Sequence, residues 1–217
     1  MRRKHIRTAG IMLLLATFSL ACRAQELEEK PDLDTRVRNF LEQPSLRWHD
    51  LNVPAADGRI LHDLIIENGY TRALEIGTST GHSGIWIAWA LSRTGGKLIT
   101  IEIDEARHRQ ALENFREAGL AEYVDARLGD AHRIVRELEG PFDFVFSDAD
   151  KDWYLNYFVD IAPKLVVNGC FTAHNVSGPG SWGAGEFYRH VSSLPGYETT
   201  LNRSGGGLSI SFKRSDK

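Results

Sequence analysis

The fold is decided by the stretch Ala73-Leu74-Glu75-Ile76-Gly77-Thr78-Ser79-Thr80-Gly81-His82-Ser83-Gly84. A short apolar run ends at Gly77, a turn of small residues follows, and a second apolar run extends from Ile85 to Leu91. This order is typical of a strand, a tight turn and a helix, the first unit of a nucleotide-binding α/β sheet. Glycine lets the backbone bend sharply there and approach a ligand closely.

The spacing of the glycines distinguishes this turn from a dinucleotide fingerprint. That fingerprint is G-x-G-x-x-G, in which the pyrophosphate lies against bare backbone at the helix N-terminus. Here Glu75 occupies the place of the first glycine. A carboxylate repels a pyrophosphate but suits a ligand with positive charge, such as the ammonium and sulfonium groups of S-adenosylmethionine. A nicotinamide site and a plain tight turn are the alternatives.

The composition is that of a folded protein of modest charge. The chain has 217 residues, of which 42% are hydrophobic, enough for a packed core. A net charge of −3 offers no basic face, so no nucleic-acid partner is expected. The two cysteines, Cys22 and Cys170, are too few for a disulfide framework or a cysteine zinc cluster.

The N-terminus has the pattern of an export signal. Residues 1–10 are basic and residues 11–21 are apolar, a run too short for an ordinary transmembrane helix. Residues 1–24 are therefore expected to be a signal cleaved near Ala21 or Ala24, or a lipoprotein signal in which Cys22 is lipidated. Either places the protein in the periplasm or on a lipid anchor, with membrane contact through this segment alone. An uncleaved anchor and a misplaced start codon are the alternatives, and without a working signal the protein is cytoplasmic.

The rest of the chain divides into a short polar segment and one domain. Residues 25–46 are polar, with a helical pattern around Val37, Phe40 and Leu41, and are expected to form a helix and linker. Residues 47–217 form the expected domain, which begins with a helix over residues 57–69. From residue 72 onward, strand patterns and helix patterns alternate.

This alternation predicts an α/β fold with a mostly parallel sheet and helices on both faces. The expected strands are Arg72–Ile76, Lys97–Glu102, Tyr123–Leu128, Phe142–Ser147, Gly169–Ala173, Tyr197–Asn202 and Gly207–Lys213. Helices are expected near residues 83–92, 106–118, 131–138 and 152–162. The glycine-rich turn between the last two strands predicts an antiparallel hairpin.

Ligands of such sheets bind at the carboxyl ends of the strands. Glu102 ends the second strand, about 25 residues after the glycine turn, where an acid can accept both hydroxyls of a ribose. A solvated acid at the strand end is the alternative. Asp130, Ala131 and His132 follow the third strand, beside the expected adenine, and Asp130 also suits the N-cap of the next helix.

The next two strand ends carry charged and metal-binding side chains. Asp148 and Lys151 follow the fourth strand, and His174 and Asn175 follow the fifth. Asp148, His174 and Asn175 are candidate ligands of one divalent ion, Mg²⁺ or Mn²⁺. Lys151 is a candidate general base for an acidic hydroxyl. The alternative for the fourth strand end is a helix N-terminus that carries acidic side chains. The alternative for His174 and Asn175 is hydrogen bonding within a loop.

In their order along the chain, five motifs resemble those of catechol and caffeoyl-CoA O-methyltransferases. They are Leu51-Asn52-Val53, the turn from Glu75 to Ser83, Thr100–Asp104, Ser147–Lys151 and His174-Asn175-Val176. The resemblance covers about residues 47–213. It implies a Rossmann-like methyltransferase fold with a seven-stranded, mostly parallel sheet whose last strand is antiparallel, and S-adenosylmethionine as the cofactor.

The resemblance also implies roles for single residues. Asp148 is implied to be a metal ligand near the methionine end of the cofactor, Asn175 another metal ligand, and Lys151 the general base. The expected cofactor contacts, with Gly81 and Asp130 included from the turn and the third strand end, are Val53, Glu75, Gly77, Thr78, Gly81, Ser83, Glu102, Asp130, Ala131, His132 and Asp148.

One residue departs from the family pattern, and one segment is open to two interpretations. His174 stands where the family normally has aspartate, and imidazole in place of an anionic oxygen weakens the preference for Mg²⁺. It favours Mn²⁺, Fe²⁺ or Zn²⁺, or abolishes metal binding. The glycine-rich residues 177–185 carry Trp182, which either closes over a planar acceptor or packs against the sheet.

The expected activity is the transfer of a methyl group to the oxygen of a small phenolic acceptor. Asp148, with any metal ion, is expected to hold the acceptor hydroxyl while Lys151 takes its proton. The alternative is an exported module that binds S-adenosylmethionine without turnover. A homodimer is a further expectation.

Overall fold

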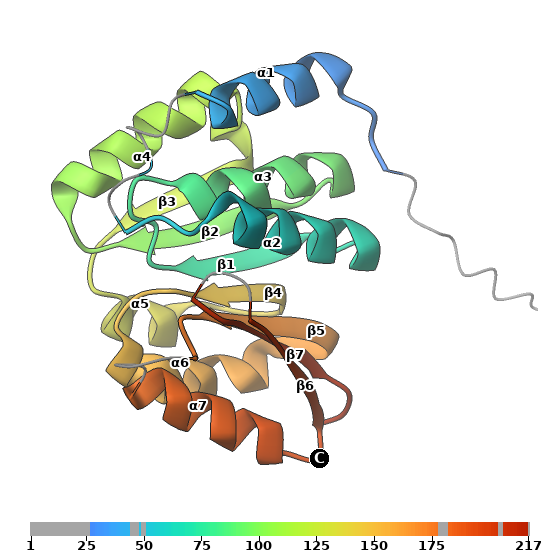
Figure 1. Cartoon of the computed structure of the whole chain (residues 1–217), viewed down its shortest axis with the longest axis vertical. Helices are drawn as coiled ribbons and strands as arrows, with labels where there is room; N and C mark the ends of the chain where they lie inside the picture. The colour runs from blue at the N-terminus through green and yellow to red at the C-terminus, as the bar shows by residue number, and fades with distance from the viewer. Residues whose placement is uncertain (1–26, 44–47, 49–50, 178–181, 204–205, 217) are drawn as a thin grey trace, which may run out of the picture.

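A computed structural model of the chain describes residues 27–43, 48, 51–177, 182–203 and 206–216. A seven-stranded sheet lies between two layers of helices (Figure 1). The strand order is β3-β2-β1-β4-β5-β7-β6, parallel from β3 to β5, with β7 antiparallel to both of its neighbours. The expected mostly parallel sheet with an antiparallel last strand is confirmed.

The strands agree closely with the predicted ranges. They are β1 (Arg72–Ile76), β2 (Lys97–Glu102), β3 (Val124–Leu128), β4 (Phe142–Ser147), β5 (Leu165–His174), β6 (Tyr197–Asn202) and β7 (Leu208–Lys213). The exception is β5, which begins ahead of its predicted start at Gly169. Asn168 adopts a positive φ of 67° within the strand and interrupts its apolar pattern, so periodicity alone does not locate the start.

The helices include one that the sequence did not predict. They are α1 (Pro31–Leu41), α2 (Ala55–Asn68), α3 (His82–Thr94), α4 (Glu105–Ala118), α5 (Ala131–Glu137), α6 (Tyr154–Ile161) and α7 (Trp182–Ser193), with 3₁₀ turns at Ala121–Tyr123, Lys151–Trp153 and Ala162–Lys164. The unexpected helix is α7. The sequence did not predict it because the glycines at its start favour a loop. Its buried side chains Ala184, Phe187 and Val191 nevertheless follow helical spacing.

The expected glycine-rich loop over residues 177–185 is therefore shorter than predicted. Residues 178–181 and the side chain of Trp182 lie outside the described part of the chain. From Trp182 onward the backbone is helical. The two interpretations of Trp182 are not tested.

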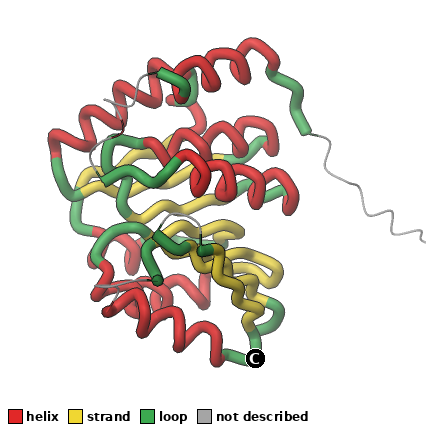
Figure 2. The backbone as a smooth tube through the Cα atoms, in the orientation of Figure 1, coloured by secondary structure: helices red, strands yellow, loops and turns green. Residues whose placement is uncertain are grey.

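The helices cover both faces of the sheet, as the tube view shows (Figure 2). On one face α2 and α3 pack through Leu61, Ile65 and Ile87 against β1, β2 and β4. On the other face α5, α6 and α7 bury a cluster that includes Phe158 and Phe187. A third cluster joins α1 to α3 and α4, so the N-terminal helix packs on the domain.

The predicted export signal, with Cys22, lies in residues 1–26, outside the described part of the chain. Within the described residues, no helix combines the length and the apolar character that crossing a bilayer requires.

Candidate active site

A pocket of about 540 Å³ opens at the carboxyl ends of the parallel strands. This volume lies within the range of small-molecule sites in proteins. The structure brings most of the predicted site residues to the pocket wall, namely Gly77, Glu102, Asp130, Ala131, His132, Asp148, Lys151, His174 and Asn175. Residues from five strand ends thus meet in one cavity, as the sequence analysis expected.

Five predicted cofactor residues do not line this pocket. They are Val53, Glu75, Thr78, Gly81 and Ser83, all of them buried. The carbonyl of Val53 accepts a hydrogen bond of 2.8 Å from Nδ1 of His82. Gly81 is the N-cap of α3, with a positive φ of 95°. Val53 contacts the turn through His82, and the other four residues belong to β1, the turn or the start of α3.

The turn itself requires glycine at position 77. Gly77 has a φ of 98°, and a Cβ atom there would lie 2.7 Å from the carbonyl oxygen of Asp148. The Asp148 amide donates a hydrogen bond of 2.8 Å to the carbonyl of Ile76. The ends of β1 and β4 therefore lie in direct contact, which brings Asp148 to the turn.

Glu75 is fully buried near the end of β1. Burial raises the pKa of its carboxyl to about 8, although hydrogen bonds from Ser83 and Thr100 oppose the shift. The Thr100 hydroxyl donates to Oε2 over 2.6 Å, whereas Oε1 has no hydrogen-bond partner among the described residues. The acidic group that the sequence analysis placed against a cationic ligand thus lies beneath the turn.

Glu102 is held rigidly at the wall by backbone donors. Its Oε2 accepts a hydrogen bond of 2.7 Å from the amide of Ser79. Its Oε1 accepts from the amides of Ile103 and Asp104, at 3.0 and 2.9 Å. The carboxylate can accept further hydrogen bonds without moving, as its expected role toward a ribose requires.

The end of β3 presents a flat aromatic surface. Asp130 caps α5 by accepting a hydrogen bond of 2.9 Å from the amide of His132, which confirms the capping interpretation. The His132 ring stacks on Trp153, with centroids 4.2 Å apart and planes at 28°. Such a surface suits the face of a heterocyclic base.

Two apolar wall residues were missed by the sequence analysis. Leu51 is 73% exposed and Ile103 is 71% exposed, and both line the pocket. Exposed apolar side chains at a cavity indicate a surface that a ligand covers. The available signal was the apolar Ile103 between two acids at the end of β2.

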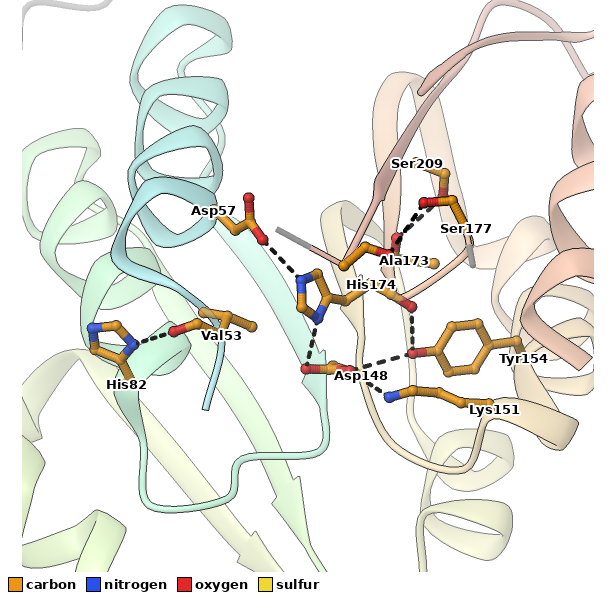
Figure 3. A network of polar contacts seen from close by, with 11 residues as sticks. Val53, Asp57, His82, Asp148, Lys151, Tyr154, Ala173, His174, Ser177 and Ser209 are labelled. Carbon is orange, nitrogen blue, oxygen red and sulfur yellow. Dashed lines mark hydrogen bonds and ion pairs between the residues drawn. The ribbon is translucent and has the colours of Figure 1, made fainter. Parts of the chain in front are cut away.

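Asp148 stands at the centre of a polar network (Figure 3). Its Oδ1 is 2.7 Å from Nζ of Lys151, which approaches from the 3₁₀ turn after β4. The hydroxyl of Tyr154 donates to the carbonyl of His174 over 3.1 Å and reaches Oδ1 of Asp148 at 3.5 Å. The structure thus pairs the predicted general base with the predicted substrate-binding acid.

His174 lies between two carboxyl groups, as Figure 3 shows. Its Nε2 is 2.9 Å from Oδ2 of Asp57, and its Nδ1 is 3.4 Å from Oδ2 of Asp148. Burial alone lowers the pKa of this imidazole, but the hydrogen bonds and charges of Asp148 and Asp57 outweigh it and raise the pKa.

Asp57, on α2, was not predicted as a site residue. It is fully buried, one turn before Leu61 on the inward face of the helix. An acid on the apolar face of an amphipathic helix was the signal that could have singled it out.

Comparisons with known proteins identify the family. A family model described as O-methyltransferase matches residues 25–181, most of the chain. This chain belongs to the O-methyltransferase family.

Its similarity to individual O-methyltransferases is moderate. It is 33% identical over 139 residues to caffeoyl-CoA O-methyltransferase 1 of Eucalyptus globulus, covering 62% of this chain and 56% of that protein. It is 34% identical over 143 residues to catechol O-methyltransferase of Niastella koreensis, covering 59% and 64%. The chain spans little more than half the length of the curated relatives it matches.

A solved structure shares the same fold. The O-methyltransferase TomG of Streptomyces achromogenes, involved in tomaymycin synthesis and determined in complex with SAM, superposes with a TM-score of 0.70 at 27% identity. The match covers 87% of this chain and 92% of TomG.

The structure places the predicted metal ligands Asp148 and His174 in contact with each other. Within the described residues, no three His, Cys, Asp or Glu side chains are grouped to hold a metal ion. Mg²⁺ takes about six oxygen ligands. Here two of the three predicted ligands, His174 and Asp148, are engaged in ion pairs. The two outcomes expected from His174, a different metal or none, stay predictions.

We predict that Glu75→Gln changes the pH dependence of stability. The native carboxyl has a pKa of about 8 against an ordinary value of 4.5, so the folded state binds the extra proton and wild-type stability falls as pH rises between those values. Thermal unfolding without ligand should therefore show that the stability of the variant, relative to that of the wild type, increases as pH rises from 4.5 to about 8. The exposed control Glu113→Gln should follow the wild type, and parallel curves for all three would contradict the burial argument.

Proposed function

We propose that this protein transfers a methyl group from S-adenosylmethionine to the hydroxyl oxygen of a small phenolic acceptor. The observation that carries the proposal is the Asp148–Lys151 pair, which shares one pocket with Glu102 and His132. Groups suited to a reacting hydroxyl and groups suited to an adenosine thus face the same cavity. The names of the relatives, caffeoyl-CoA and catechol O-methyltransferases, support a phenolic acceptor.

The residues present fit S-adenosylmethionine. Glu102 offers a rigid acceptor for ribose hydroxyls, and Ile103 and His132 offer apolar and aromatic surfaces for the adenine. Oε1 of Glu75 is a buried acceptor with no partner among the described residues, close to the turn where a cationic group is expected. The bound TomG structure supports the same cofactor.

The chain's own groups suit proton removal from the acceptor. The cofactor, when bound, would supply an electrophilic methyl group. Asp148 holds the acceptor hydroxyl as a hydrogen-bond acceptor, and Nζ of Lys151 takes its proton. Because Nζ lies 2.7 Å from Oδ1 of Asp148, the proton it gains is stabilised by that carboxylate. Holding the reactants in line contributes much of the acceleration.

Calorimetry of the full chain with S-adenosylmethionine, followed by a methyl-transfer screen on phenols and catechols, tests the proposal. We expect saturable binding and an O-methylated product. Binding without transfer to any acceptor would support the non-catalytic module instead, an alternative that the comparisons do not favour. Uptake of NAD in place of S-adenosylmethionine would overturn both.

Lys151→Ala should separate turnover from binding. Loss of a general base is expected to lower kcat roughly 10²- to 10⁴-fold while the Kd for S-adenosylmethionine changes little. Steady-state kinetics and calorimetry measure the two quantities, and the exposed control Lys97→Ala should match the wild type in both. An unchanged kcat would remove Lys151 from the mechanism.

We also propose that residues 1–24 direct export, on the strength of the basic and apolar runs in the sequence. Expression of the full chain in a bacterium should then yield a periplasmic or membrane-anchored protein. Intact-mass measurement distinguishes cleavage near Ala21 or Ala24 from lipidation of Cys22, and Cys22→Ala should release a lipid-anchored form. Recovery of the uncleaved chain in the cytoplasm would contradict export. The expected homodimer stays a prediction.

A further inference from the structure

Four charged side chains form a closed set at the ends of β4 and β5. Lys151 and His174 each contact Asp148, on different carboxylate oxygens, at 2.7 and 3.4 Å. The other ring nitrogen of His174 contacts Asp57 at 2.9 Å. Figure 3 shows the imidazole lying between the two acids, with Lys151 beyond Asp148.

Three of the four side chains are buried or nearly so, and that of Lys151 is 32% exposed. The side chains of Asp57 and His174 are 1% and 6% exposed, and that of Asp148 is 10% exposed. Buried carboxylates are costly unless each has a cationic or hydrogen-bonded partner. Both ring nitrogens of His174 are directed at carboxylate oxygens, and Oδ1 of Asp148 contacts Nζ of Lys151. The atoms that would hold a divalent ion are therefore already in contact with one another.

We infer that this protein takes no divalent ion, because His174, held between Asp57 and Asp148, occupies the position where one would bind. The inference concerns how the site works in the proposed reaction, and therefore rests on the proposed function for its catalytic meaning. The absence of metal binding itself does not depend on that function.

The presence of His174 in place of a metal ion changes how the acceptor hydroxyl is held. A metal ion would bind the acceptor oxygen directly and lower its pKa. Here that oxygen meets Nζ of Lys151 beside Asp148, while His174 and Tyr154 hold Asp148 in place. His174 is a positioning residue in this scheme, since its two ring nitrogens are directed at carboxylates.

The same atoms also suit an arrangement in which a metal ion is bound. A metal ligand histidine commonly donates its second nitrogen to a carboxylate, as His174 does to Asp57. In that arrangement an ion would lie between Nδ1 of His174 and Oδ2 of Asp148. Direct measurement of metal binding separates the two arrangements.

The test is titration of the full chain, purified without chelators, with Mg²⁺, Mn²⁺ and Zn²⁺, with and without S-adenosylmethionine. We expect no saturable heat, no stoichiometric metal by elemental analysis, and the same Tm in EDTA as in MgCl₂. A bound ion would raise Tm by roughly 5 °C or more at a concentration far above its Kd. Stoichiometric metal, or such a shift with any of the three ions, would overturn the inference.

His174→Asp provides a gain-of-binding variant. It replaces the imidazole with a carboxylate beside Asp57 and Asp148, and oxygen ligands are those that Mg²⁺ prefers, so we expect Mg²⁺ to bind and raise the Tm of the variant. The matched control is His190→Asp on the exposed side of α7, whose Tm should not respond to Mg²⁺. A folded His174→Asp protein whose Tm does not respond to Mg²⁺ would contradict the inference that His174 excludes the ion. If the variant does not fold, the titration of the unaltered chain still decides.

Methyl transfer is measured separately, as initial rates with a phenol before and after exhaustive chelation. Rates that are unchanged by EDTA support the inference, and rates lost on chelation and restored by metal overturn it. Failure to methylate any acceptor would defeat the proposed function alone, because calorimetry and Tm would still report on metal binding.

Discussion

The contact between the ends of β1 and β4 is the constraint on which the site depends. The carbonyl of Asp148 lies so close to Gly77 that any side chain there would collide with it. The turn can therefore pass beside Asp148 only with a glycine in the left-handed region. This contact sets Asp148 beside the pocket, and the network of Lys151 and His174 is built on Asp148.

Local patterns in the sequence were enough to predict the sheet and most of the strand-end residues. Each strand is a run of neighbouring residues, and the carboxyl ends of parallel strands must share an edge. Glu102, Asp130 and Asp148 were placed correctly for that reason. The cap at Asp130 depends on residues two apart and was equally accessible.

The depth at which a side chain is buried, and contacts between residues far apart in the sequence, could not be predicted in the same way. Alternation indicates which strand residues are inward, but not that Glu75 lies beneath a turn with Thr100 and Ser83 as partners. Asp57 meets His174 across 117 residues of sequence, a separation at which no spacing rule operates. The start of α7 was hidden because glycine is a poor helix former, and tertiary packing by Phe187 overrides that preference.

Two buried acids of the site, Asp57 and Glu75, show why its two ends favour different ligands. Asp57 is matched by His174, so its end of the pocket is balanced within the chain. Glu75 has hydroxyl partners but no cation among them, and Asp148 and Glu102 add to the rise in its pKa. The turn beside Gly77 is therefore short of positive charge, whereas the end at His174 is not. A cationic ligand lowers the free energy at the first end, while a further cation at the second end would have to displace His174 or Lys151 from Asp148.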